Sequence, residues 1–195
     1  MRPNISVILS TYNSPDWLEK VLWGYAVQTD RDFEVIVADD GSNDAVRRRI
    51  DRMCEELDLN IRHIWQPDDG FRKSTILNKA IVASHGNYLI ISDGDCVPRS
   101  DYVAMHRRFA RPKRFLSGGY FMLPMGVSVD LTRDDVASGR AMSYRWLREQ
   151  GVEWSVQCWK LQARVRWPPF WIAVRRPAPH GTGTTRPVGN RTSSR

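Results

Sequence analysis

The stretch YLIISDGD, residues 88–95, decides the fold prediction for this chain. Four apolar or aromatic residues run directly into Ser92 and then into two carboxylates, Asp93 and Asp95, which are separated only by Gly94. An uninterrupted apolar run of this length predicts a strand that is buried on both faces, as in the middle of a parallel sheet. The two carboxylates then lie at the carboxyl end of that strand, where open α/β sheets bind their ligands.

Two neighbouring carboxylates repel each other and lose hydration, so a bound cation is one physical reason for placing them side by side. Their hard oxygen ligands suit Mg²⁺ or Mn²⁺. A surface turn is the alternative, because Asp-Gly is common turn chemistry. Taken alone, the pair fits a metal site and a turn equally well.

The residues before this stretch alternate between strand and helix patterns. Buried strands are predicted at 5–10 and 33–38, a short strand at 61–65, and helices at 15–28, 44–57 and from 72 onwards. Ser14 is expected to cap the start of the first helix, and Gly86 is expected to end the third helix as its C-cap glycine. This order requires a mostly parallel sheet with right-handed connections and helices packed against it.

The pattern is less regular beyond residue 95. A helix is expected over 100–110, and the apolar residues of 115–123 predict another strand. Thr132 and Asp135 have the spacing of a capping box, which predicts the start of a helix that ends near Gln150.

Polar side chains follow three of the predicted strands at the point where each strand ends. If the strands are neighbours, these side chains meet in one crevice, with Arg72 or Lys73 at the start of a nearby helix. Such a set suits a nucleoside diphosphate, because an aromatic ring can stack on the base, a carboxylate can accept from base or ribose, and an arginine can bind phosphate oxygens. Neither a GxGxxG motif after the first strand nor a P-loop motif is present. The strand-end residues are Ser10, Thr11, Tyr12, Asn13, Asp39, Asp40, Asp93 and Asp95.

The net charge of +7 comes from the end of the chain. Residues 154–195 hold 8 of the 29 Lys and Arg residues and none of the 22 Asp and Glu residues. A basic tail can bind polyanions, but this one has no periodicity and is rich in Pro, Gly, Thr and Arg. This composition predicts disorder rather than a nucleic-acid-binding surface, so no nucleic-acid partner is expected.

The remaining composition points to a cytoplasmic protein. No apolar run approaches the ~20 residues of a membrane-spanning helix. The three cysteines lie far apart, as reduced thiols do, and neither they nor the four histidines show metal-ligand spacing. The histidines are therefore expected to be structural or exposed.

The chain resembles the family 2 glycosyltransferases, which have the GT-A fold, a Rossmann-like α/β architecture. The resemblance rests on four motifs in order, none of them specific alone, which cover about the first 105 residues. They are SVILSTYN (6–13), VIVADDGSND (35–44), DDGFRKSTILNKAI (68–81) and YLIISDGDCVPRSDYV (88–103).

The resemblance implies roles for individual residues. Ser10 and Tyr12 match positions that line the base pocket, Asp40 matches the carboxylate that recognises the base, and Arg72 matches a basic residue beside base and phosphates. Without such roles, Ser10 would only end a strand and Arg72 would be a solvated charge at a helix start. Asp39 could likewise only cap the turn that follows it.

The resemblance also implies the reaction. Asp93 matches a carboxylate near the ribose, and Asp95 matches the metal-binding end of the DxD motif, with Mn²⁺ or Mg²⁺ as the cofactor. The expected activity is inverting transfer of a hexose from a nucleoside diphosphate sugar, with UDP favoured, to a hydroxyl of a glycan or another acceptor. Polysaccharide or cell-envelope glycan synthesis is the expected process, in the cytoplasm or at the inner face of the membrane.

The expected organisation is a glycosyltransferase domain over 1–166, with a nucleotide-binding half at 1–105 and a partial acceptor half at 106–166, followed by a basic tail at 167–195. In the family, the catalytic base lies in a late acidic motif after a Trp-rich segment. Here no Asp or Glu follows Trp167, so the catalytic residue is unidentified. The late carboxylates, which match no such motif, are Asp130, Asp134, Asp135, Glu149 and Glu153.

The missing acidic motif leads to a hypothesis: the chain departs from its parent sequence near 167–171, through a shifted reading frame or a truncation. The alternative is a genuine family variant with a disordered basic tail. Two functions follow from these possibilities, an active glycosyltransferase and a catalytically inert fragment that still binds nucleotide.

Overall fold

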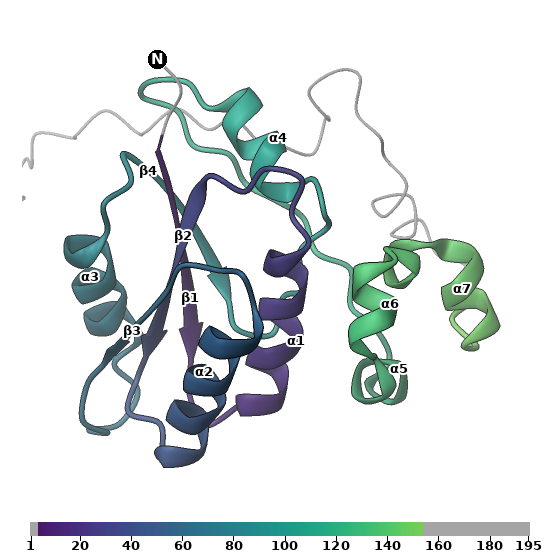
Figure 1. Ribbon diagram of the computed structural model, residues 1–195, viewed down its shortest axis with the longest axis horizontal. Coiled ribbons are helices and arrows are strands. Elements are labelled where there is room, and N and C mark those ends of the chain that lie inside the picture. The colour runs from purple at the N-terminus through teal and green to yellow at the C-terminus, as the bar shows by residue number, and fades with distance from the viewer. Residues whose placement is uncertain (1–3, 154–195) are drawn as a thin grey trace, which may run out of the picture.

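The computed structural model describes residues 4–153 of the 195-residue chain. A four-stranded parallel sheet in the order β3-β2-β1-β4 lies at its centre, with helices on both faces (Figure 1). The α/β architecture predicted from the sequence is therefore confirmed. Along the chain the elements are β1 (Ile5–Thr11), α1 (Pro15–Ala26), β2 (Phe33–Asp39), α2 (Asp44–Glu56), β3 (Ile61–Trp65), α3 (Lys73–Ala83) and β4 (Tyr88–Asp93).

Strands β1 and β2 form the buried middle of the sheet. Their register pairs Ser6 with Glu34, Ile8 with Ile36, and Ser10 with Ala38. Apart from the partly buried Phe33, the apolar side chains of both strands are almost completely buried, which fits strands covered on both faces. Because side chains alternate between the faces of a strand, Ser6, Ile8 and Ser10 all point to the same face.

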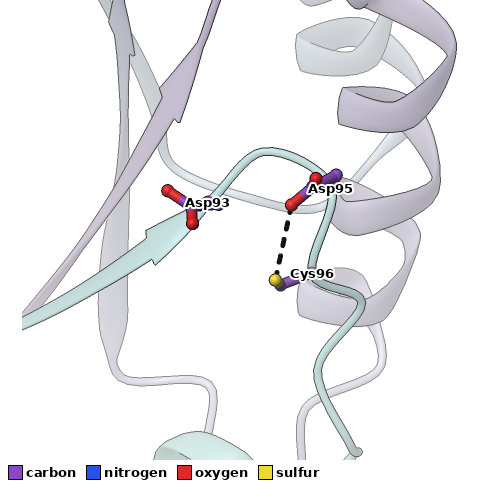
Figure 2. A group of neighbouring side chains, drawn as sticks. All are labelled: Asp93, Asp95 and Cys96. Carbon is purple, nitrogen blue, oxygen red and sulfur yellow. Dashed lines mark hydrogen bonds between the residues drawn. The ribbon is translucent and has the colours of Figure 1, made fainter. Parts of the chain in front are cut away.

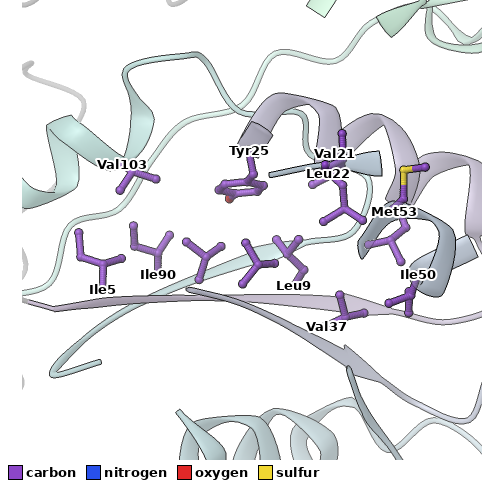
Figure 3. Packing of buried hydrophobic residues seen from close by; sticks show 14 of the residues in the cluster. Ile5, Leu9, Val21, Leu22, Tyr25, Val37, Ile50, Met53, Ile90 and Val103 are labelled. Carbon is purple, nitrogen blue, oxygen red and sulfur yellow. The ribbon is translucent and has the colours of Figure 1, made fainter. Parts of the chain in front are cut away.

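The two faces of the sheet have separate cores. On one face, side chains of the strands pack against α1 and α2, and Tyr25 and Met53 belong to this larger cluster (Figure 3). On the other face, Ile8 and Ile36 pack against Ile76 and Ala80 of α3. The strand ends therefore project from a rigid layer that is fixed on both sides.

The predicted position of β4 in the middle of the sheet was wrong, since this strand lies at one end of the four-strand order. Ile90 is buried, but Ile91 is 51% exposed. Ile91 is level with Ile8 on the face that α3 covers, and α3 packs mainly over β1, β2 and β3. An apolar run indicates a strand, but the order of strands depends on which of them pair.

Two helix ends differ from expectation. The α1 helix has Pro15 in its first turn, but the hydroxyl of Ser14 donates to the carbonyl oxygen of Tyr12 at 2.9 Å instead of capping the helix. The α3 helix ends at Ala83, so Gly86 is not its C-cap. Gly86 instead passes close to β1, where a Cβ would lie 2.5 Å from the backbone nitrogen of Ser6.

Residues 110–153 contain short helices and small apolar clusters. The predicted strand at 115–123 was wrong, because this segment has no strand and forms only an isolated bridge at Phe115. Gly118 and Gly119 offer no side chains to pack against a neighbouring strand, and Phe121 contacts the small cluster of Val127 and Leu147. The elements after β4 are α4 (Tyr102–Phe109), α5 (Met125–Asp130), α6 (Arg133–Ala137), η1 (Arg140–Met142) and α7 (Tyr144–Glu149).

The capping box at Thr132 and Asp135 is confirmed, with reciprocal hydrogen bonds between each side chain and the other's backbone N–H. The helix that it starts is shorter than predicted, because Gly139 adopts a left-handed conformation with φ of 72° and ends it. The α6 helix packs against α1, and α5 and α7 lie nearby (Figure 1). Within residues 4–153, none of the helices has the length and apolar character needed to cross a membrane.

Candidate functional site

The sheet brings the predicted strand-end residues to one edge. Strand β1 lies between β2 and β4, so its last residues are level with the ends of both neighbours: Ser10 pairs with Asp93, and Thr11 pairs with Asp39. The Ser10 hydroxyl donates to Asp93 Oδ1 at 2.9 Å. The predicted convergence of these side chains therefore occurs, at the carboxyl edge of the sheet.

Asp40 is almost completely buried at this edge of the sheet. Its Oδ1 accepts from Gln66 Nε2 at 2.6 Å, and its Oδ2 accepts from the backbone N–H of Arg72 at 2.8 Å. An ionised carboxylate has about four acceptor positions, so two remain for a ligand donor. Gln66 was missed by the sequence analysis, since it lies in a polar turn without periodicity. Its Oε1 is buried and has no hydrogen-bond partner within the described residues.

Asp39 has a different position from its neighbour. It is 1% exposed, and its Oδ1 accepts from the backbone N–H of Ser42 at 2.8 Å. Its Oδ2 lies 3.0 Å from His63 Nε2. These contacts correspond to the turn-capping alternative, and a ligand contact by Asp39 stays a prediction.

Asn13 and Thr11 shape the loop after β1. Asn13 adopts a left-handed conformation with φ of 47°, which asparagine tolerates better than most residues. Its backbone N–H donates to Ser42 Oγ at 2.9 Å, and its Oδ1 accepts from the backbone N–H of Asn43 at 3.0 Å. Asn13 thus joins the loops after β1 and β2. The Oγ1 of Thr11 is buried without a partner in the part of the chain that the structure describes.

Tyr12 offers an aromatic face at the same edge. Its side chain is exposed, and its hydroxyl donates to Asp68 Oδ2 at 2.9 Å. This hydrogen bond raises the pKa of Tyr12 above its usual value. A half-exposed ring that is held at its hydroxyl can stack on a planar ligand. Asp68 was not predicted as a site residue, although it begins one of the four motifs.

The two basic residues at this edge pair with different acidic residues. Lys73 Nζ donates to Asp93 Oδ1 at 2.5 Å, and this hydrogen bond lowers the pKa of Asp93. The guanidinium of Arg72 instead pairs with Asp69 at 2.5 Å, on the exposed surface. Of these two residues, it is therefore Lys73 that contacts the acidic strand end.

Asp93, Asp95 and Cys96 form one group, with one potential ligand atom from each lying within 4.8 Å of the others (Figure 2). The turn at Gly94 makes this possible: its N–H donates to the carbonyl oxygen of Ser10 at 2.8 Å. A Cβ at Gly94 would lie only 2.8 Å from that same oxygen, so the turn requires glycine.

The donor set fits a hard divalent cation. Two ionised carboxylates supply oxygen ligands of the kind that Mn²⁺ and Mg²⁺ prefer. Cys96 Sγ donates to Asp95 Oδ1 at 3.4 Å, and burial together with this contact raises the pKa of the Cys96 thiol to about 11. A protonated thiol is a poor metal ligand, so the oxygens of Asp93 and Asp95 are the residues that could hold the cation.

The fold and this acidic edge define a GT-A-like domain. Among solved structures, the chain is similar to a mannosyltransferase from Pyrobaculum calidifontis, determined in complex with GDP-Man and Mn²⁺. The TM-score is 0.55 at 27% sequence identity, and the match covers 72% of this chain and 41% of that one.

The model of glycosyl transferase family 2 matches residues 6–120, and the chain belongs to this family. It is similar to chondroitin synthase from Escherichia coli, with 37% identity over 100 residues, or 51% of this chain and 14% of that protein. It is also similar to validoxylamine A glucosyltransferase from Streptomyces hygroscopicus subsp. jinggangensis, with 34% identity over 103 residues, or 52% of this chain and 24% of that protein. The chain thus matches less than half the length of each relative.

Proposed function

We propose that the carboxyl edge of the sheet binds a nucleoside diphosphate sugar together with a divalent cation, as the donor site of an inverting hexosyltransferase. The observation that carries this proposal is the register of β1 with β2 and β4. This register places an exposed aromatic ring at Tyr12, a buried acceptor at Asp40 and the carboxylates of Asp93 and Asp95 at one edge.

Each residue has a chemical role in this proposal. Tyr12 stacks on the base, and Asp40 accepts a hydrogen bond from a base N–H. Asp93 lies beside the ribose, where its open oxygen can accept from a hydroxyl. Ser10 keeps the Asp93 carboxylate in place through its 2.9 Å hydrogen bond. A cation held by Asp95 and Asp93 would neutralise the departing diphosphate as a Lewis acid.

The donor and the process are the finer parts of the proposal. We favour a UDP-sugar, with transfer to a glycan hydroxyl in polysaccharide or cell-envelope synthesis. Similarity to chondroitin synthase supports a polysaccharide product, whereas the solved mannosyltransferase contains GDP-Man, so the base has to be tested directly. The expected location, in the cytoplasm or at the inner face of the membrane, stays a prediction.

A second candidate is an inert fragment that binds nucleotide without transferring sugar. This candidate is favoured because a late carboxylate that could act as the catalytic base is already paired. Asp135 is buried in the capping box with Thr132 and also pairs with Arg140. Glu149 pairs with Arg145 on the surface of α7. NMR measurement of free UDP released from a UDP-sugar, with and without an acceptor, separates the two candidates. Only a transferase releases UDP faster when an acceptor is added.

Calorimetric titration of UDP with and without Mn²⁺ tests the proposed site. Wild-type protein is expected to bind UDP in a Mn²⁺-dependent manner, and Asp95→Asn is expected to weaken this binding at least about ten-fold, the scale of a lost charged contact. Asp51→Asn, which removes the same charge from an exposed position on α2, should bind as wild type does. GDP and dTDP in the same titration identify the base. A folded protein that binds none of the three nucleotides would contradict the proposal.

A further inference from the structure

The first turn of α3 carries an unusual charge pattern. Helix N-termini bear partial positive charge and are normally stabilised by acidic residues. The α3 helix instead has Arg72 at its N-cap and Lys73 at its first position, without an acidic residue in the first turn. These charges add to the positive end of the helix dipole, and carboxylates from outside the helix meet them: Asp69 pairs with Arg72, and Asp93 pairs with Lys73.

Within residues 4–153, Lys73 pairs with one acidic residue, Asp93, which lies inside the candidate site. Its Nζ donates to Asp93 Oδ1 at 2.5 Å, and the same oxygen accepts from Ser10 Oγ at 2.9 Å. The Lys73 and Asp93 side chains are 37% and 56% exposed. An ion pair with this exposure contributes little stability and separates at little cost.

The position of this ammonium conflicts with a cation on the same acids. Asp93 belongs to the group with Asp95 whose ligand atoms lie within 4.8 Å of one another, so a cation held there would repel the Lys73 ammonium. Arg72 does not share this conflict, because its guanidinium pairs with Asp69. Lysine suits a change of partner, since its charge is compact and its four-carbon stem is flexible.

We infer that Lys73 is an exchangeable counter-ion of the acidic pair: it neutralises Asp93 when the site is empty and moves its ammonium to the diphosphate oxygens of the donor when Asp93 and Asp95 hold a cation. This inference rests on the proposed function, because it assigns the diphosphate as the second partner. No covalent bond changes; one ion pair is exchanged for another.

The exchange has a measurable consequence. A cation that binds alone has to displace Lys73 without providing a new anionic partner for it, whereas a cation that binds with nucleoside diphosphate provides one. Cation and nucleotide should therefore bind cooperatively, and Lys73 should carry part of the coupling. A residue with a purely structural role would not affect the two affinities in opposite directions.

Calorimetry on the full chain at constant ionic strength tests this inference, because exposed ion pairs are sensitive to salt. Mn²⁺ alone is titrated first, and UDP is then titrated at saturating Mn²⁺. For Lys73→Gln, we expect Mn²⁺ alone to bind about three-fold tighter, since a competing exposed ion pair is removed. UDP should bind roughly ten-fold more weakly, since a charged hydrogen bond to the diphosphate is lost.

Lys79→Gln is the matched control, because Lys79 is an exposed lysine on the same helix; both of its affinities should equal those of wild type. The inference is overturned if Lys73→Gln leaves either affinity unchanged or moves both in the same direction. Failure of the proposed function gives a different result: wild-type protein itself would bind no nucleotide with Mn²⁺. The inference about Lys73 would then be contradicted as well.

Discussion

A serine hydroxyl donates to a carboxylate at each end of strand β1, but the two carboxylates differ in exposure. At the amino end, the Ser6 hydroxyl donates to Glu34 at 2.6 Å; at the carboxyl end, the Ser10 hydroxyl donates to Asp93 at 2.9 Å. Glu34 is 6% exposed, whereas the Asp93 side chain is 56% exposed. The same serine–carboxylate pair is therefore closed at one end of the sheet and open at the other.

The closed end has its acceptors occupied. Besides the Ser6 hydroxyl, Glu34 accepts from the backbone N–H of His85 at 2.7 Å and pairs with Arg62 at 3.4 Å. Burial opposes ionisation, but the hydrogen bonds from Ser6 and His85 outweigh it and lower the pKa of Glu34. A buried carboxylate in such a network contributes to stability and has little capacity left for a ligand.

The open end has its acceptors only partly occupied. Asp93 Oδ1 accepts two hydrogen bonds, and Asp95 and Asp40 retain acceptor positions. Carboxylates that are gathered at an edge without complete pairing cost stability, and a cation and a diphosphate would offset this cost. The amino end therefore stabilises the sheet, whereas the carboxyl end keeps acceptor positions open, as expected of the ligand site proposed above.

Glu34→Ala is expected to have the largest effect on the free energy of unfolding. It removes the buried acceptor of Ser6, His85 and Arg62, and breaking such a network costs about 4 kcal/mol. Urea denaturation measures this loss. Glu56→Ala, which removes an exposed glutamate paired with Arg52, should change the value by less than about 1 kcal/mol. Equal effects of the two variants would show that the amino end is not a closed network.

His106 gives the closed end a dependence on pH. Its Nδ1 lies 3.0 Å from the Tyr88 hydroxyl at the start of β4, and burial lowers the pKa of His106 from 6.5 to about 4. Between these values the unfolded chain binds more protons than the folded one, so stability falls as the pH decreases. From pH 7 to pH 5, we expect a loss of about 2 kcal/mol.

Urea denaturation of wild type and His106→Phe across this pH range tests the assignment. The variant should lose most of the pH dependence while retaining the ring contact with Tyr102, which lies at 4.6 Å between centroids. Asp93→Asn should keep the wild-type dependence. An unchanged pH slope in His106→Phe would assign the dependence to other groups.

Ser6→Ala and Ser10→Ala compare the two ends with one chemical change. Ser6 also accepts from the backbone N–H of Gly86 at 2.8 Å, so its loss leaves buried groups unpaired and should cost about 1.5 kcal/mol of unfolding free energy. Ser10→Ala should cost less than about 0.5 kcal/mol, because water can replace the contact to exposed Asp93. The comparison fails if Ser10→Ala destabilises the protein as much as Ser6→Ala does.

The sequence was sufficient for the alternation of strands and helices and for the acidic strand end, since both are encoded in local patterns. Apolar runs with capped helices between them predicted β1 to β4, and the spacing of Asp93 and Asp95 predicted their proximity. The edge position of β4 was not predictable in the same way, because strand order depends on pairing between distant residues.

Other features depended on packing that no local pattern records. The apolar residues at 115–123 have strand character, but a strand also needs a partner along its length. Gln66 and Asp68 lie in a polar turn, and they contact Asp40 and Tyr12 only because the turn folds over the end of the sheet. Such residues are identified from three-dimensional contacts.

An NMR titration of ¹⁵N-labelled protein with UDP and Mg²⁺ tests directly where on the sheet the ligand binds. Amide signals at the carboxyl edge, including those of Ser10, Asp40 and Gly94, are expected to shift with the ligand. Signals of Ser6 and Glu34, on the same two strands at the closed end, should stay in place. Shifts concentrated at the closed end, or no shifts in a folded sample, would contradict the claim that the carboxyl edge is the ligand site.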